Sequence, residues 1–88
     1  MLIPVYHKKF EKEIERSQKR GQNISKLKKV MELLVQEKPL DSKHRNHPLK
    51  GDFAGYWECH IESDWLLIYK KTRTHIHFAR TGTHSDLF

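Results

Sequence analysis

The spacing of the hydrophobic residues changes at Pro39, and this change limits the folds that the chain can adopt. Before Pro39, apolar residues recur three and four positions apart, as in an amphipathic helix. These positions are Ile24, Leu27, Met31, Leu34 and Val35. After Pro39, residues 56–61, 65–71 and 75–81 form apolar or alternating segments typical of strands, separated by short polar turns. Helices followed by consecutive strands predict an α+β fold.

The N-terminal part of the chain predicts one strand and two helices. Residues 2–6 are apolar and partly β-branched, and Pro4 favours a sheet edge or a strand start. Residues 7–21 indicate a helix, and Gly21 occupies the position typical of a C-cap glycine. Asn23 can cap the second helix. The two helices are therefore expected to form a hairpin with a basic outer face.

Length and composition favour one small domain. The chain has 88 residues, of which 36% are hydrophobic, so residues 1–88 are expected to form a single domain with a small core. Its predicted order is an N-terminal strand, a helical hairpin and an antiparallel β-meander, with the helices on one sheet face. Cys59 is the only cysteine, which fits a reducing cytoplasm. The longest apolar run, residues 65–69, is too short to span a membrane, and the N-terminus does not resemble a signal peptide.

Charged and titratable residues are distributed unevenly along the chain. The net charge is +6 with histidine neutral, and residues 1–45 hold twelve Lys and Arg against six acidic residues. Residues 46–88 hold five of each, together with five of the seven histidines. A cationic half favours a polyanionic partner such as RNA, DNA or an acidic protein. A solvated basic surface is the alternative at this point.

The predicted strands bring distant polar residues to one end of the sheet. Antiparallel neighbours reverse direction, so the end of strand 75–81 returns to the level of the 62–64 turn. If the glycine-containing segment after His47 closes a hairpin, His47 lies near Cys59 or His60, with about 5 Å between Cβ atoms. The residues expected to converge are His47, His60, Asp64, Trp65, Arg80 and His84.

Alternation along the strands refines this expectation. It places Glu58 and His60 on the face turned away from the helices. It also groups Arg80 with Ile76 and Phe78 on the opposite face. Arg80 therefore reaches the cluster only if a bulge or an early strand end redirects it.

Such a cluster has the groups needed to cleave RNA without a metal. Two histidines can act as base and acid near neutral pH, and Asp64 can fix a tautomer or raise the pKa of a neighbour. Arg80 and Lys50 can neutralise phosphate, and Trp65 and Phe88 can stack on bases. One group would deprotonate the ribose 2′-OH, which attacks the adjacent phosphorus. Another would protonate the leaving 5′-oxygen.

Several of these residues could have purely structural roles instead. Trp65 could cap the end of the sheet, and Phe88 could be a frayed terminus. Three lysines of the second helix could form a solvated face with a secondary role in holding RNA. They are Lys26, Lys28 and Lys29.

A metal site is the main chemical alternative to acid–base cleavage. His44 and His47 are three positions apart, but zinc sites normally have three or four ligands at tighter spacing. We therefore expect neither a metal nor a cofactor. His75 and His77 lie at the other end of the last strand and are expected to be ordinary surface residues.

Three segments, "NHPLKG", "CHIESDWLLIY" and "RTGTHSDLF", resemble the marker segments of YafQ-type toxins, a branch of the RelE/ParE superfamily of bacterial toxin–antitoxin systems. The resemblance covers nearly the whole chain and implies a RelE-like fold. It also implies an endoribonuclease that enters the ribosomal A site as a monomeric toxin and cuts translated mRNA. A cognate antitoxin would hold it inactive.

The resemblance also implies which residues form the site. Five residues match the histidines, acid and closing phenylalanine of the family segments: His47, His60, Asp64, His84 and Phe88. Trp65 and Arg80 match positions that line the same cleft. We expect His84 to be the general acid and His47 the general base, while His60 and Asp64 orient them or hold the phosphate.

Two rival functions remain open from the sequence. A ParE-like toxin would have the same fold but would inhibit DNA gyrase by binding it, and it would have no chemical need for the histidines. A basic DNA-binding module would bind duplex DNA with a steep salt dependence.

Overall fold

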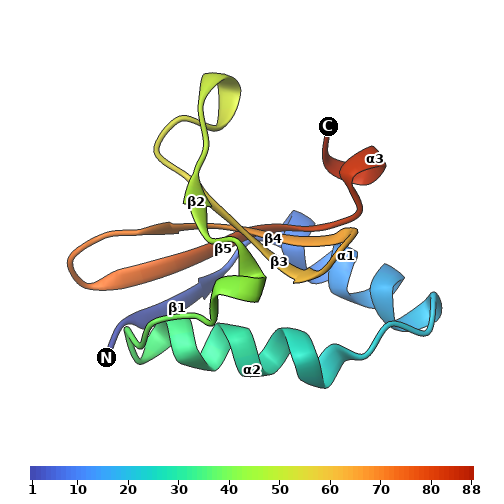
Figure 1. Ribbon diagram of the computed structural model, residues 1–88, viewed down its shortest axis with the longest axis horizontal. Coiled ribbons are helices and arrows are strands. Elements are labelled where there is room, and N and C mark those ends of the chain that lie inside the picture. Colours follow the sequence, from blue (N-terminus) through green and yellow to red (C-terminus); the bar gives the residue numbers. More distant parts are fainter.

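A five-stranded mixed sheet forms the centre of the molecule, with strand order β1-β5-β4-β3-β2 (Figure 1). The computed structural model describes residues 1–88. Its strands are β1 (Ile3–Tyr6), β2 (His47–Pro48), β3 (Trp57–Glu62), β4 (Trp65–Lys71) and β5 (His75–Gly82). Its helices are α1 (Lys8–Lys19), α2 (Ile24–Val35) and α3 (His84–Leu87), and two short 3₁₀ turns span Ser42–His44 and Gly51–Phe53.

The order of the elements agrees with the sequence-based prediction. The N-terminal strand, the helical hairpin and the antiparallel meander follow one another, and α1 and α2 lie on the same side of the sheet (Figure 1). β1 is an edge strand, as Pro4 indicates, but it pairs parallel to β5. The sequence pattern did not predict α3, which lies on the other side of the sheet from α1 and α2.

The helix ends follow the expected capping chemistry. Gly21 has a φ of +81°, and the backbone N–H groups of Gly21 and Gln22 donate to the carbonyls of Gln18 and Ser17, which closes α1. The side chain of Asn23 accepts a hydrogen bond from a backbone N–H of the first turn of α2. α2 ends at Val35, before Pro39, where the hydrophobic spacing changes.

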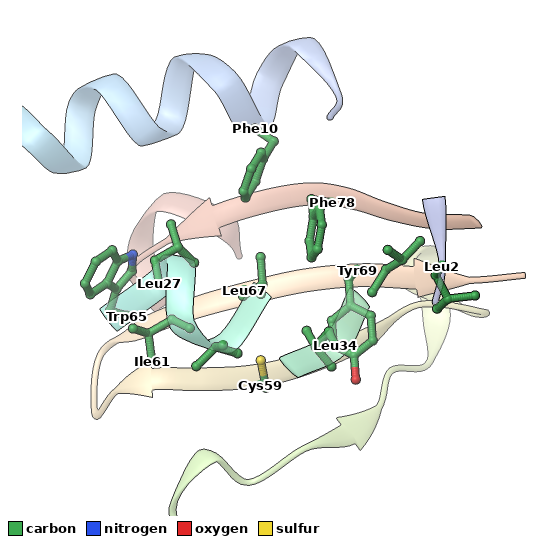
Figure 2. Close-up of a cluster of buried hydrophobic side chains, with 12 residues drawn as sticks. Leu2, Phe10, Leu27, Leu34, Cys59, Ile61, Trp65, Leu67, Tyr69 and Phe78 are labelled. Atoms are coloured by element: carbon green, nitrogen blue, oxygen red, sulfur yellow. The ribbon is translucent and has the colours of Figure 1, made fainter. Parts of the chain in front are cut away.

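The core lies between the two long helices and the sheet (Figure 2). Phe10 of α1 and Leu27 of α2 are fully buried against strand residues of this face. The buried cluster comprises Leu2, Phe10, Leu27, Val30, Leu34, Cys59, Ile61, Trp65, Leu67, Tyr69, Ile76 and Phe78. Burial raises the pKa of the Cys59 thiol to about 12, so this thiol stays protonated and unreactive at neutral pH. None of the helices has the length and apolar character needed to cross a membrane.

The opposite face of the sheet, here called the outer face, carries a smaller apolar cluster and the polar residues of the site. Its buried cluster is formed by Leu66, Ile68, Ala79 and Leu87. Alternation in β3 is as predicted, because Cys59 and Ile61 belong to the core cluster and Glu58 faces His47. The outer face is bordered by β2, the Gly51–Phe53 turn and α3 (Figure 1). These short elements frame the polar site, while the long helices cover the core.

Candidate active site

The sheet register brings the expected histidines to one end of the outer face. His47 of β2 pairs with Glu58 of β3. His60 lies two residues further along β3 and pairs with Leu66 of β4. Leu66 in turn pairs with Gly82 of β5, which is two residues before His84. The rings of His60 and His84 are 5.9 Å apart between centroids. The structure therefore brings His47, His60 and His84 together, as the reversal of antiparallel strands predicts.

Glu58 joins two of these histidines. Its side chain is buried, and Oε2 lies 2.9 Å from Nε2 of His47 and 3.7 Å from Nε2 of His60. Because a carboxylate only accepts hydrogen bonds, His47 carries a proton on Nε2 and donates it to Glu58. Nδ1 of His47 lies 3.2 Å from the carbonyl oxygen of Pro48. Nε2 of His47 is thus held by Glu58, and Nδ1 is the nitrogen left for a substrate.

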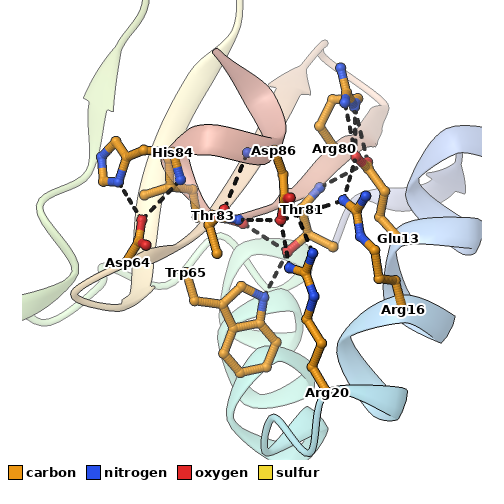
Figure 3. Close-up of polar contacts among 11 residues, drawn as sticks. Glu13, Arg16, Arg20, Asp64, Trp65, Arg80, Thr81, Thr83, His84 and Asp86 are labelled. Carbon is orange, nitrogen blue, oxygen red and sulfur yellow. Dashed lines mark hydrogen bonds and ion pairs between the residues drawn. The ribbon is translucent and has the colours of Figure 1, made fainter.

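His84 forms a second carboxylate–histidine pair, with Asp64 (Figure 3). The backbone N–H of His84 donates to Oδ1 of Asp64 at 2.9 Å, and the ring Nδ1 donates to the same oxygen at 2.6 Å. These two hydrogen bonds, the backbone one first, lower the pKa of Asp64 below its ordinary value. Since Nδ1 is held by Asp64, Nε2 of His84 is left to exchange a proton with a substrate.

The helix that carries His84 is tied to the rest of the protein by Asp86 (Figure 3). The hydroxyl of Thr83 accepts from the backbone N–H of Asp86, and the carboxylate of Asp86 accepts from the backbone N–H of Thr83, which forms a capping box. Arg20, the C-cap residue of α1, donates to both carboxylate oxygens of Asp86, at 2.7 and 3.2 Å. These contacts, the Arg20 hydrogen bond foremost, hold the pKa of Asp86 well below its usual range.

Replacing Gly82 with Ala should displace α3. A Cβ at this position would lie 2.9 Å from the Cβ of Asp86 and 3.0 Å from its Oδ2. We expect Gly82→Ala to cost about 1–3 kcal/mol in the free energy of unfolding, as overpacking usually does. We also expect it to weaken the His84–Asp64 contact. Urea unfolding measures the first effect, and the activity proposed below should fall at least tenfold.

Gly21→Ala is the matched control for that variant. Gly21 also has a positive φ, but a Cβ there meets nothing within 4 Å. Its cost is backbone strain alone, about 1–2 kcal/mol. If Gly21→Ala loses a similar amount of stability but keeps its activity, the loss of activity in Gly82→Ala is due to the displacement of α3 and not to lower stability. Equal activity in both variants would contradict the contact between Gly82 and α3.

Trp65 does not line the site, which corrects the expectation that it stacks on RNA. Its side chain is only 1% exposed and belongs to the core cluster. The indole Nε1–H donates to the hydroxyl of Thr81 at 3.0 Å (Figure 3). Trp65 closes the end of the core, so the alternative structural role is the correct one.

Arg80 reaches the outer face through a β-bulge, but it does not contact the histidines. The register of β4 and β5 shifts so that Ile68 pairs with Arg80 while Tyr69 pairs with Phe78. The guanidinium Nε and one terminal nitrogen of Arg80 each lie 2.9 Å from a carboxylate oxygen of Glu13 in α1 (Figure 3). This buried partner, which hydrogen-bonds to Arg80, raises its pKa. Arg80 is therefore already neutralised by α1.

The lysines expected to hold RNA occupy different surfaces. Lys26 and Lys29 line a groove of about 630 Å³ that is also bordered by His44 and His60. Nζ of Lys26 lies 2.8 Å from a carboxylate oxygen of Glu62 at the rim. Lys28 lies away from this groove, in a separate apolar one between α1, α2 and β1. The side chain of Lys50 is exposed and makes no hydrogen bond or ion pair.

Phe88 is an exposed aromatic residue beside the site. Its side chain is 63% exposed, and its ring packs edge-on against Phe53, with 5.6 Å between centroids. Its backbone N–H donates to the carbonyl of His84 at 2.9 Å. The C-terminal ring is thus fixed one turn from His84, where a base could stack on it.

Glu58 is a site residue that the sequence does not single out. Alternation places it on the same face as His60, but an isolated glutamate in a strand gives no signal of its own. The signal that could have found it is its spacing from His60, combined with the hairpin that brings His47 opposite β3.

The same three residues also form a donor set that could hold a metal ion. One ligand atom each from His47, Glu58 and His60 lies within 4.8 Å of the others. Two imidazoles and a carboxylate suit a divalent transition metal such as zinc or copper. An ion there would compete with protons for the groups that could act as acid and base.

Comparison with known proteins identifies relatives that match nearly the whole chain. Residues 3–88 match the family described as "Bacterial toxin of type II toxin-antitoxin system, YafQ". The mRNA interferase toxin YafQ of Escherichia coli K12 is 43% identical over 84 residues, which cover 94% of this chain and 91% of that protein.

Solved structures of related toxins have the same fold. A chain of the E. coli DinJ–YafQ toxin–antitoxin complex gives a TM-score of 0.93 at 41% identity, covering 99% of this chain and 97% of that one. A metal-bound toxin from Helicobacter pylori gives a TM-score of 0.94 at 38% identity over 100% of both chains. The RelE-like α+β architecture expected from the sequence is confirmed. With the family match spanning nearly every residue, this chain belongs to the YafQ family of bacterial type II toxin–antitoxin toxins.

Proposed function

We propose that this toxin is an mRNA interferase that cuts translated mRNA in the ribosomal A site, in the cytoplasm, by metal-free attack of the ribose 2′-OH. The observation that carries the proposal is the pair of carboxylate–histidine contacts, His47–Glu58 and His84–Asp64, on either side of His60. The name of the E. coli relative, an mRNA interferase toxin, agrees with this chemistry.

His47 is the proposed general base. The buried carboxylate of Glu58 stabilises a proton on His47, as an acid partner does for a catalytic histidine. RNA at the site would displace the Pro48 carbonyl from Nδ1, which would then accept the 2′-OH proton. The His47 side chain is 47% exposed, so its ring can reach a bound ribose.

His84 is the proposed general acid. Asp64 fixes Nδ1 as the donor toward the carboxylate, so Nε2 would deliver the proton to the leaving 5′-oxygen. The His84 side chain is 54% exposed, and a substrate can therefore approach it directly. Each acid or base of this kind contributes about 10²–10⁴-fold to a rate.

His60 and nearby cations would hold the scissile phosphate between these two groups. The His60 side chain is 12% exposed and lies between Glu58 and the ring of His84. Lys26 and Lys29, on the rim of the adjoining groove, and the exposed Lys50 can bind flanking phosphates. Phe88 would stack on a base, whereas Arg80 would stay bound to Glu13 and is not assigned a phosphate.

The proposed partners are the translating ribosome with its mRNA, and a cognate antitoxin. A net charge of +6 favours binding to ribosomal RNA. The existence of a DinJ–YafQ complex in E. coli supports an antitoxin for this chain as well. We infer that the toxin acts as a monomer when the antitoxin is absent.

Primer extension on a message in a translating extract tests this function. Cuts within the open reading frame, absent when translation initiation is blocked, are expected. Intact mRNA together with inhibited DNA gyrase would favour the ParE-like alternative. Tight, salt-sensitive binding to duplex DNA with no cleavage would favour the DNA-binding alternative.

Cleavage should have a bell-shaped dependence on pH if histidines serve as base and acid. Asp64 should not set the acid limb, because its pKa lies below the ordinary value of 3.8. A lowered pKa keeps the carboxylate ionised as the pH falls toward 4, and the contact with His84 is lost only when the pH falls through the folded-state pKa. Single-turnover rates from pH 5 to 9 measure the profile. A flat profile would contradict the two-histidine mechanism.

A further inference from the structure

A second group of histidines lies at the opposite edge of the sheet from His47. His7 follows β1, while His75 and His77 are two residues apart on β5 and therefore point to the same face. Nε2 of His7 and Nδ1 of His77 are 3.2 Å apart, and the rings of His75 and His77 are 6.4 Å apart between centroids. The sequence alone predicts ordinary surface roles for His75 and His77, and the proposed cleavage chemistry uses none of the three histidines.

The spacing of the two nitrogens suits a shared metal ion. Zinc binds histidine nitrogens at about 2.0–2.1 Å, so two ligands of a tetrahedral ion lie about 3.3 Å apart. The separation between His7 and His77 is close to this value.

A third histidine, His75, lies beside His77 on the same strand. Nδ1 of His75 is 2.7 Å from the hydroxyl of Thr74, which leaves its Nε2 available. The ammonium of Lys70 lies 5.6 Å from the centroid of the Tyr56 ring, over its face. All three histidines are partly exposed, so an ion can enter from solvent. A site of imidazoles alone selects late transition metals and not magnesium or calcium.

We propose that His7 and His77 form a binding site for a divalent transition-metal ion such as zinc, nickel or copper, and that His75 joins them as a third ligand when its side chain rotates toward the ion. The site is separate from the set formed by His47, Glu58 and His60, because β1 and β2 are opposite edges of the sheet. A bound ion would link β1 to β5, the one parallel strand pair in the fold. It would therefore stabilise the attachment of the N-terminal strand in a metal-dependent way.

Metal titration of paired variants tests the site. The background is His47→Gln/His60→Gln, which removes the histidines of the other donor set. This protein should still bind one equivalent of zinc by isothermal titration calorimetry. Copper(II) should broaden amide NMR signals near residues 5–9 and 75–79. Adding His7→Gln and His77→Gln should weaken zinc binding at least tenfold, and His75→Gln alone should weaken it by a smaller factor.

Two results would overturn the proposed metal site. A background protein that binds no zinc would overturn the proposal, and so would unchanged affinity after the His7 and His77 replacements. In that case the 3.2 Å contact is a direct hydrogen bond between the two rings. Circular dichroism checks that each variant is folded. If the combined variant does not fold, the single His77→Gln replacement decides the matter by the same tenfold criterion.

Discussion

Replacing His84 with Ala is expected to lower the rate of mRNA cleavage about 10²–10⁴-fold, which is the contribution of a general acid. The fold should survive, because the side chain is more than half exposed and its only hydrogen bond is to Asp64. The capping box between Thr83 and Asp86 does not involve the ring. Exposed substitutions of this kind usually change the free energy of unfolding by less than about 0.5 kcal/mol. Primer extension and urea unfolding measure the two quantities.

Ser85→Ala is the matched control, since Ser85 is an exposed neighbour on the same short helix. It should leave both cleavage and stability unchanged. Asp64→Asn should give an intermediate loss of cleavage, because the amide can no longer stabilise the charged imidazole. Cleavage by His84→Ala at the wild-type rate would exclude His84 as the acid.

Replacing Trp65 with Ala should have the largest effect on stability. Truncation of a fully buried tryptophan costs about 3–5 kcal/mol. A domain of this length has a total of about 4–13 kcal/mol to lose, at about 0.05–0.15 kcal/mol per residue. The variant would also lose the hydrogen bond from the indole to Thr81. Urea unfolding should therefore show a protein that is marginally stable or unfolded, with activity lost in proportion.

Trp65→Phe separates the structural role from RNA stacking. Phenylalanine keeps an aromatic ring in the core but cannot donate to Thr81, which should cost about 1 kcal/mol. The folded variant should cleave mRNA at close to the wild-type rate. A fully folded Trp65→Phe protein with a cleavage defect of 100-fold or more would mean that the indole contacts substrate after all.

The parts of the fold that the sequence could predict depend on local periodicity. The helical spacing of Leu27 and Leu34 and the capping residues Gly21 and Asn23 determine the helical hairpin without tertiary information. The convergence of His60 and His84 also follows from simple geometry, since consecutive antiparallel strands must reverse. The structure shows both features.

The remaining features depend on contacts that the sequence does not encode locally. Glu13 and Arg80 are 67 residues apart, and only the packing of α1 against β5 brings them together. Glu58 gains its role from β2, a strand of two residues that is too short to give a pattern. The burial of Trp65, in contrast, can be predicted from the sequence. Trp65 lies on the same face of β4 as Leu67 and Tyr69, which belong to the core cluster, so strict alternation places it in the core.

The chemistry of the cut ends tests the central claim most directly. Attack by the ribose 2′-OH leaves a 2′,3′-cyclic phosphate, or its hydrolysis product, on one fragment and a 5′-OH on the other. We predict these ends when purified ribosomes that carry a defined message are treated with the toxin, with the toxin freed of transition metals beforehand by EDTA. Fragments that carry a 3′-OH and a 5′-phosphate, or cleavage that stops once the toxin is metal-free, would contradict acid–base catalysis by these histidines.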